Sequence, residues 1–434
     1  ADNSNNINTT DKEQTFITGT DPNNYIWYSG KLWRAVSIDP NDNSVKLVTQ
    51  WNISSISYNE SSNTSFAGSN MEAWLNDTSV DGFLNNLRDK EKFIKMDSVW
   101  NASETTDPTK LDKTVMVTDP VGLLNIYEYV MSSSGVGVSN GYLNNNTLWW
   151  TITPYTDNNL IYEVFSDGTY NPTYFPGSSF GIRPCINLKP DVGVMEGNGT
   201  IDYPYRLYGD NDKDLSGTLL STRYSGEYIR FGTGENNLYR IVSHENGTGT
   251  KITSAEPLKS NGEFITLDYK KDNIFESFSL NSNVGSFLNN TYLNTYIDST
   301  YLNMIEENTN WYLGVVDGHG TSYKLAKYID VNLSSTVSYT TTTVGLLRYG
   351  ELMAGQFNVI SNNIIYGTLT MINNNNEYLR VISEDSNAYD YYPITYVFGI
   401  KPSFNLKSNV IITSGTGTKD DPFNLGCNYS QSRK

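Results

Sequence analysis

The stretch Gly-Ile-Arg-Pro-Cys-Ile-Asn-Leu-Lys at residues 181–189 decides the fold, because it returns as Gly-Ile-Lys-Pro-Ser-Phe-Asn-Leu-Lys at residues 399–407. The segment behind each copy also repeats, as Gly-Asn-Gly-Thr-Ile-Asp-Tyr-Pro-Tyr at 197–205 and Gly-Thr-Gly-Thr-Lys-Asp-Asp-Pro-Phe at 415–423. Copies this far apart are not the units of roughly 20–50 residues that build solenoid proteins. The sequence therefore predicts a duplicated globular domain of ordinary size.

Two further motifs repeat upstream in the same order. Val-Gly-Leu-Leu at 121–124 returns at 344–347, and Trp-Arg-Ala-Val-Ser at 33–37 returns as Tyr-Arg-Ile-Val-Ser at 239–243. Because the order is kept, we expect the two copies to share one topology.

The motifs set the domain boundaries that we predict. The first domain spans 24–208 and the second spans 216–426, with a short polar linker at 209–215 that is rich in Asp, Asn and Gly. Residues 1–23 form a polar arm whose start is typical of a processed N-terminus, and residues 427–434 form a loose tail.

Composition limits the partners. The formal net charge of −17 makes nucleic acid and anionic membrane surfaces poor partners. Charged residues make up only 18% of the chain, below the usual quarter, and Asn, Ser, Thr and Tyr take their place. Either an extracellular protein or an AT-rich coding sequence would have this composition. No apolar run reaches the length of about 18 residues that a membrane span needs, so we expect no direct membrane insertion of this chain.

The two cysteines do not form a disulfide framework. Cys185 aligns with Ser403 in the second copy, and Cys427 lies beyond the last motif. This placement favours two separate thiols over a bridge between the domains.

The elements expected in the first copy are strands, then short helices, then strands. Alternating aromatic and β-branched residues predict strands at 25–28, 32–38 and 45–49, with a hairpin turn at Ser29-Gly30. Apolar spacing predicts helices at 69–75, 81–93 and 119–129, the first capped by Ser69 and the third by Asp119. Further strands are predicted at 149–154, 160–165, 179–188 and 205–207.

The second copy follows the same course. Strands are predicted at 228–231 and 238–243, helices at 284–288, 292–307 and 343–354, and further strands at 366–369, 378–382, 397–406 and 410–413. This order of elements predicts the α+β class rather than alternating α/β.

The motifs that close each copy resemble a family of bacterial surface domains. Trp-Trp-Thr-Ile-Thr-Pro at 149–154, a variable stretch, and then the two closing motifs resemble domains of Gram-positive pilin-like proteins and adhesins. The fold of that family is similar to the C-type lectin-like fold of formylglycine-generating enzymes and of variable proteins diversified by retroelements. The resemblance implies two tandem C-type-lectin-like domains, each a mixed antiparallel sheet with short helices.

The motif residues have structural roles in this interpretation. They are Trp149, Trp150, Arg183, Pro184, Lys401 and Pro402. We expect one tryptophan to face the core and the other to face outwards or towards the helices. We expect Arg183 to lock a loop across the sheet, although a guanidinium at this place could also hold a carboxylate. The second copy departs from the pattern, with Lys401 for the arginine and Tyr366-Gly367 where the first copy has its tryptophans.

No residue pattern predicts catalysis or a cofactor. The two histidines, His244 and His319, are not grouped with partners, and the cysteines do not match the copper-binding pair of formylglycine-generating enzymes. A weak calcium candidate is formed by Asp210, Asp212 and Asp214, for which a solvated linker is the alternative. No carboxylate pair with a supporting motif occurs at equivalent places in both copies, so a glycan hydrolase is only a third interpretation.

The variable stretch before each closing motif is the predicted recognition face. The candidate residues are Tyr155, Asn158, Tyr162, Glu163, Tyr170 and Tyr174 in the first copy, and Tyr378, Arg380, Tyr389, Tyr391 and Tyr392 in the second. Mixtures of Tyr and Asn form adaptable binding surfaces, as in antibody loops. Surface loops that drifted after duplication are the alternative.

These features lead to an extracellular, non-catalytic adhesin or surface-appendage protein. Its partner would be a host or bacterial surface protein, a glycan, or neighbouring subunits of an appendage. The alternative is a structural pilus, filament or surface-layer subunit without a ligand.

Overall fold

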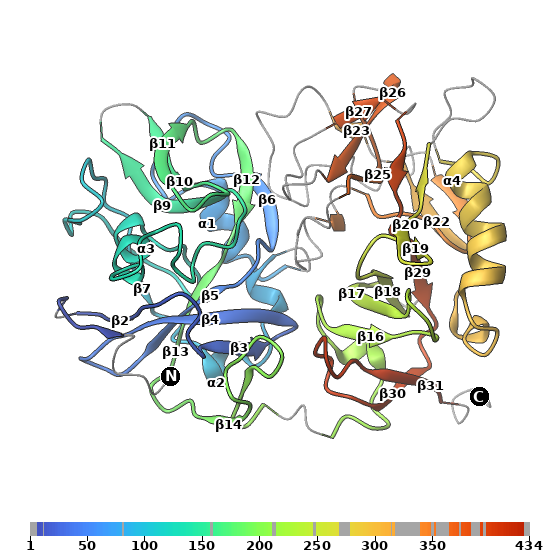
Figure 1. Ribbon diagram of the computed structural model, residues 1–434, viewed down its shortest axis with the longest axis horizontal. Helices are drawn as coiled ribbons and strands as arrows, with labels where there is room; N and C mark the ends of the chain where they lie inside the picture. The colour runs from blue at the N-terminus through green and yellow to red at the C-terminus, as the bar shows by residue number, and fades with distance from the viewer. Residues whose placement is uncertain are drawn as a thin grey trace.

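The α+β class is confirmed, because sheets dominate the structure and the helices are short. The computed structural model describes residues 7–11, 13–79, 82–156, 159–210, 214–245, 249–268, 278–313, 315–316, 339–348, 351–352, 364–372, 375–382, 391–393 and 396–428. Two lobes lie side by side, one formed by the first half of the chain and one by the second (Figure 1).

One sheet of the first half has the order β1-β2-β4-β3-β15-β14, with β5 joined to β4 and β13 joined to β5. Its strands are β1 (Ile7–Asn8), β2 (Thr15–Ile17), β3 (Tyr25–Tyr28), β4 (Lys31–Ile38), β5 (Val45–Thr49), β13 (Cys185–Leu188), β14 (Val194–Glu196) and β15 (Tyr205–Leu207). The hairpin predicted at Ser29-Gly30 is confirmed. Both residues are left-handed, with φ of 53° and 73°, as two-residue turns between strands require.

The other sheet of the first half carries the tryptophan strand. Its order is β11-β10-β9-β12-β6, with β6 (Ser54–Ser57), β9 (Trp149–Tyr155), β10 (Leu160–Val164), β11 (Tyr170–Tyr174) and β12 (Ser179–Ile182). A separate hairpin is formed by β7 (Val99–Asn101) and β8 (Met116–Thr118). Both tryptophans of β9 are buried: Trp149 packs edge-on against Tyr129 of the helix α3 (Ile126–Ser132), and Trp150 packs against Tyr58 and Phe180.

The second half repeats the first sheet strand by strand. Its order is β16-β17-β18-β29, which matches β3-β4-β5-β13, and the hairpin β30-β31 joins β16 through a bridge from Ile229 to Phe423. These strands are β16 (Tyr228–Arg230), β17 (Leu238–Glu245), β18 (Gly249–Ser254), β29 (Ser403–Leu406), β30 (Val410–Ser414) and β31 (Asn424–Cys427).

The second sheet repeats as well. Its order β21-β28-β25-β26-β27 matches β6-β12-β9-β10-β11, and in both halves the pair at the centre is parallel. The strands are β21 (Thr266–Leu267), β25 (Tyr366–Ile372), β26 (Asn375–Ile382), β27 (Tyr391–Pro393) and β28 (Phe398–Gly399), with β23 (Val315–Val316) beside β25. Two small hairpins complete the half: β19 (Lys259–Ser260) with β20 (Glu263–Phe264), and β22 (Thr309–Tyr312) with β24 (Tyr339–Thr342).

The strand predicted over 179–188 is wrong as one element, and so is the strand predicted over 397–406. Each breaks at the proline of its motif, Pro184 or Pro402, and the two pieces join different sheets. Proline has no N–H to give to a ladder, so the break falls where the chain crosses between the sheets.

The helix α1 (Asn70–Leu75) is confirmed, with the Ser69 hydroxyl accepting the N–H of Glu72. The helix predicted over 81–93 is wrong. The chain forms a 3-10 turn, η2 (Leu84–Asn86), and a short helix, α2 (Lys90–Phe93). Between these two elements the backbone of Leu87 is extended and its side chain is buried, and the backbone of Asp89 is left-handed. The burial of Leu87 in the core therefore interrupts the predicted helix.

The helix predicted over 119–129 begins too early. The helix α3 (Ile126–Ser132) is capped by Asn125, not by Asp119, and Glu128 completes a capping box. The preceding Gly122 is paired with Cys185 through two backbone hydrogen bonds of 3.0 and 2.9 Å.

The helix predicted over 343–354 shows the same error, because Gly345 pairs with Ser403 through two bonds of 2.9 Å. Of that range, only Glu351 and Leu352 are described as helical. The helices predicted at 284–288 and 292–307 are instead one continuous helix, α4 (Asn283–Ser286) running into the π-helix η4 (Phe287–Tyr296), followed by a 3-10 turn, η5 (Leu302–Met304). A last 3-10 turn, η3 (Leu220–Thr222), opens the second half.

A buried lysine network also repeats. Lys46 pairs with Glu128 and lies 5.1 Å from the centre of the Trp100 ring. In the second half Lys251 pairs with Glu351 and lies 5.1 Å from the Trp311 ring. The duplication therefore extends from strand order to individual charged side chains.

Buried charges join the two halves. Arg88 of the first half donates to Asp210 at 2.8 and 2.6 Å and to Glu227 of the second half at 3.0 Å. Lys31 is fully buried and donates to the carbonyl oxygens of Ser29 and Ser225. The start of the predicted linker, at Asp210, is therefore buried against the first half and is not solvated.

The Val-Gly-Leu-Leu motif generates a stability prediction. A β-carbon on Gly122 would lie 2.3 Å from the Trp100 ring, so Gly122→Ala should lower the free energy of unfolding by about 1–3 kcal/mol in urea titrations. Gly193→Ala is the control, because its nearest atom beyond its own neighbours lies 3.9 Å away. Equal free energies of unfolding for the two variants would show that the Trp100 ring leaves room for a β-carbon at position 122.

Candidate functional site

Arg183 serves the framework and is not open to a ligand. The side chain is buried, its Nε donates to the Thr49 carbonyl at 2.8 Å, and Nη1 donates to the Leu143 carbonyl at 2.5 Å. The guanidinium lies 4.7 Å from the centre of the Trp149 ring. In the second half Lys401 is buried and lies 4.9 Å from the Tyr366 ring, so both motifs place a cation against the first aromatic residue of the neighbouring strand.

Two residues of the predicted recognition face are buried, so their assignment to an exposed face was wrong. Tyr162 packs against Tyr155, and the Glu163 carboxylate accepts the backbone N–H groups of Thr173 at 3.0 Å and Tyr174 at 2.9 Å. Burial raises the pKa of Glu163 to about 8, against the opposing effect of these two hydrogen bonds. Glu163 therefore holds β11 against β10.

The exposed part of this face is smaller than predicted. Tyr155 and Tyr170 are half-buried and Tyr174 is 36% exposed. Phe175, which follows β11 in the same variable stretch, is 60% exposed but was not among the candidate residues. Tyr174 lies 4.5 Å from the Phe180 ring, which fixes its orientation.

The second-copy candidates are only partly described. Tyr378 is half-buried on β26, where it pairs with Pro393 of β27. The backbones of Arg380 and Tyr391 pair across the same two strands, as do those of Leu379 and Tyr392, but the side chains of Arg380, Tyr391 and Tyr392 lie outside the description. Asn158 and Tyr389 lie outside the described residues.

The calcium candidate is overturned at Asp210, because both carboxylate oxygens of Asp210 bind the Arg88 guanidinium. Asp214 is exposed, and Asp212 lies outside the described residues. Across the part of the chain that the structure describes, no three His, Cys, Asp or Glu side chains form a group that could hold a metal ion.

Of the remaining side chains that could carry chemistry, His244 is held by hydrogen bonds, and the two cysteines are not joined in a disulfide. His244 is half-buried against Thr250 and the Arg223 carbonyl, and His319 lies outside the described residues. Cys185 and Cys427 are free thiols, and burial raises the pKa of Cys185 far above its usual value.

One carboxyl pair lies in the first half. Burial and the neighbouring Glu72 carboxyl raise the pKa of Asp119 to about 7. Neither residue lines the pocket described next. The pair therefore lies outside that pocket.

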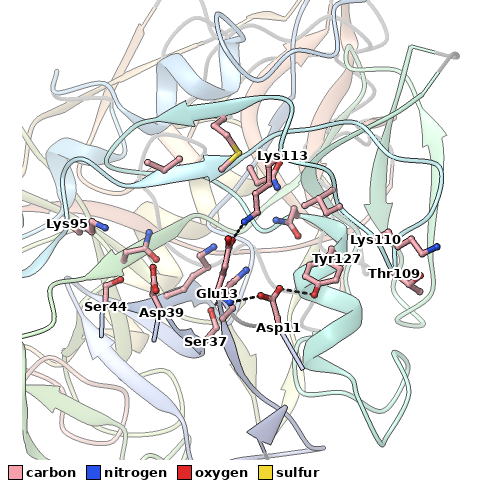
Figure 2. Close-up of a pocket in the computed structure, with 18 residues that line it drawn as sticks. Asp11, Glu13, Ser37, Asp39, Ser44, Lys95, Thr109, Lys110, Lys113 and Tyr127 are labelled. Atoms are coloured by element: carbon pink, nitrogen blue, oxygen red, sulfur yellow. Dashed lines mark hydrogen bonds and ion pairs between the residues drawn. The ribbon is translucent and has the colours of Figure 1, made fainter. Parts of the chain in front are cut away.

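A polar pocket of about 390 Å³ lies between the edge of the first sheet, the β7-β8 hairpin and α3 (Figure 2). Its lining is mostly amide, hydroxyl and charged side chains. The residues are Asp11, Glu13, Gln14, Ser37, Asp39, Ser44, Lys46, Lys95, Val99, Asn101, Thr109, Lys110, Leu111, Lys113, Met116, Asn125, Tyr127 and Asn187.

Most charges of the pocket are paired. Glu13 meets Lys113, and Asp11 accepts the Tyr127 hydroxyl at 2.8 Å, as the dashed lines in Figure 2 mark. Burial, with the hydrogen bond to Asp11, raises the pKa of Tyr127 to about 12, which keeps its hydroxyl a donor.

The deeper lysines are paired too. Lys46 is held by Glu128, and Lys95 lies 2.7 Å from Asp42. Although burial raises it, the pKa of Asp42 is lowered to about 2 by hydrogen bonds from Lys95 and Ser44. Lys110 is exposed and forms no ion pair with a described residue. The pocket therefore offers many hydrogen-bonding groups and little net charge.

The apolar side chains lie together on the β7-β8 hairpin. Val99 is 49% exposed and Met116 is 46% exposed at the pocket. A pocket with polar groups that converge beside a small apolar lip can orient a ligand through hydrogen bonds. Sequence reasoning missed this site because its residues come from separate segments between 11 and 187, and the two that lie in repeated motifs, Ser37 and Asn187, are far apart in the sequence.

Comparison with known proteins gives one match. Residues 43–190 match the model of a family described as "Domain of unknown function (DUF6273)". The match covers about a third of the chain and includes the pocket residues from Ser44 to Asn187. No curated protein and no solved structure matches this chain.

The buried carboxyl of Glu163 generates a pH prediction. Its native pKa of about 8 lies above the ordinary value near 4.5, so its contribution to stability is present below pH 4.5 and is lost as the pH rises to 8. The variant Glu163→Gln cannot titrate. The free energy of unfolding of the parent, relative to that of the variant, should therefore be larger at pH 5 than at pH 8. A constant difference would show that the native carboxyl is already ionised at pH 5.

Proposed function

We propose that this chain is a non-catalytic binding protein of the bacterial cell surface, formed by two tandem C-type-lectin-like domains. We further propose that the polar pocket of the first half binds a neutral, hydroxyl-rich ligand such as a glycan. The observation that carries the proposal is the pairing of charges in the pocket, which leaves amide and hydroxyl side chains for a ligand.

The charges argue against an anionic ligand. The Nζ atoms of Lys46, Lys95 and Lys113 each face a carboxylate, so an added anion would have to displace one. Sugar hydroxyls can both donate and accept, and they match paired lysines, carboxylates and amides without displacing any of them. The apolar lip at Val99 and Met116 would face the carbon side of a sugar ring.

A surface location is proposed on composition and on the motif resemblance. The chain has few charged residues and many Asn, Ser, Thr and Tyr. Among the described residues no helix has the length and apolar character that crossing a membrane requires.

The alternative, a structural filament subunit, is less well supported, because one edge strand of each half contains a proline. Pro172 lies on β11 and Pro393 lies on β27, which are the corresponding edge strands of the two halves. A proline on an edge strand removes a donor and blocks addition of another strand. These two edges therefore do not suit polymerisation by strand pairing.

A glycan array with the full chain tests the proposal. The pocket variant combines Asn187→Ala with Lys110→Ala, because neither side chain has a hydrogen bond or ion pair with a described residue that its loss would break. Loss of two hydrogen bonds to a ligand, each about 0.5–1.5 kcal/mol, should weaken glycan binding about tenfold.

The control combines Asn405→Ala, which is the corresponding asparagine of the second half, with Lys419→Ala, an exposed lysine. This variant should bind like the parent. The proposal fails if the parent binds no glycan, or if both double variants bind equally. Filaments seen by electron microscopy together with an empty array would favour the structural subunit.

A further inference from the structure

The strand β14 is the outer edge of the first sheet. Among the described strands it pairs only with β15, and it is the last strand in the order of that sheet (Figure 1, bottom of the first lobe). Val194 lies opposite Leu207 and is 56% exposed. No other described strand continues the sheet beyond β14.

The second half shows what covers the equivalent edge. There Ile412 of β30 lies opposite Leu425, the position that Val194 has opposite Leu207, and Ile412 is fully buried. The Ile412 carbonyl accepts the N–H of Gly217 at 2.8 Å, and its own N–H donates to the Thr218 carbonyl at 2.9 Å. A bridge from Leu219 to Ile411 extends this contact.

The covering segment, Leu215–Leu219, is the stretch of chain that enters the second half. Leu215, the first residue of this segment, and Leu220, which follows its end, pack into the hydrophobic core of the second half. In the first half the entering chain takes another path, because β2 pairs with the far end of β4 through Thr15 and Phe16. The first half therefore uses its entering chain elsewhere, and no described segment covers the outer edge of β14.

Apolar side chains gather around this edge. The large exposed hydrophobic residues from β14 to the residue that follows β15 are Val194, Met195, Ile201, Tyr203 and Tyr208. Exposed apolar groups next to an unpaired strand edge are typical of a surface that accepts a further strand.

We propose that β14 accepts an extended, leucine-bearing segment of another polypeptide chain, which would pair with Val194 as Leu215–Leu219 pairs with Ile412. The backbone of the incoming strand would exchange hydrogen bonds with the Val194 peptide groups, and its leucines would cover Val194 and Met195. Such strand addition draws affinity from the main chain and specificity from alternate side chains. This surface is separate from the polar pocket and does not depend on the proposed glycan binding.

The probe is a fluorescein-labelled peptide with the sequence of residues 214–221, Asp-Leu-Ser-Gly-Thr-Leu-Leu-Ser. Fluorescence anisotropy with the full chain should show saturable binding that a scrambled peptide lacks. The variant Val194→Asp places a charge in the proposed contact and should weaken binding at least about tenfold. The variant should fold like the parent, because Val194 is largely exposed, and circular dichroism checks this.

Val397→Asp is the matched control, since Val397 is a similarly exposed valine of the second half that lies outside both proposed sites. It should leave the affinity within about twofold of the parent, because it removes no contact with the peptide. Two results would overturn the inference. One is binding no stronger than that of the scrambled peptide. The other is binding that Val194→Asp does not change, which would place the peptide elsewhere, such as on β30.

Discussion

The two sheets of each half are joined where a buried cation meets an aromatic ring. The chain leaves one sheet at Ile182 and enters the other at Cys185, and Arg183 lies in between. Its guanidinium binds carbonyl oxygens at Thr49 and Leu143 and covers the Trp149 ring. A buried charge is costly unless its donors find acceptors, so this crossing point can form only when all three segments are in place. Strand order, burial of the tryptophans and the position of β5 all depend on it.

Local signals predicted much of the framework. The hairpin at Ser29-Gly30 and the helix capped by Ser69 follow from neighbouring residues alone, and both are present. The errors lie where a distant contact decides the backbone. Gly122 has apolar neighbours that suit a helix, but pairing with Cys185 and the Trp100 ring keep it extended.

The candidate sites were harder to predict than the fold. Glu163 reads as an exposed residue of an alternating strand, but β10 has irregular pairing between Ile161 and Glu163, and both Tyr162 and Glu163 are buried. The lysines and asparagines of the polar pocket are far apart in the sequence. Only the tertiary structure brings them together, and it pairs three of the lysines with carboxylates.

Comparison of the two halves separates the features that both copies keep from the features that differ between them. The lysine beside a tryptophan, the glycine beneath that tryptophan and the cation after the glycine-isoleucine pair occur in both halves. The path of the entering chain differs, and so does the exposure of the corresponding edge strands β14 and β30. Binding surfaces on this framework are therefore best sought where the halves differ.

The most direct test of this account is the free energy of unfolding of Arg183→Leu, measured with Arg183→Lys beside it. Leucine keeps an apolar side chain at this place but leaves the Thr49 and Leu143 carbonyls without their donors, which should cost about 2–4 kcal/mol. Lysine should cost less, since Lys401 occupies the same place in the second half. A leucine variant as stable as the parent would contradict the account, because the two sheets would then hold together without the cation.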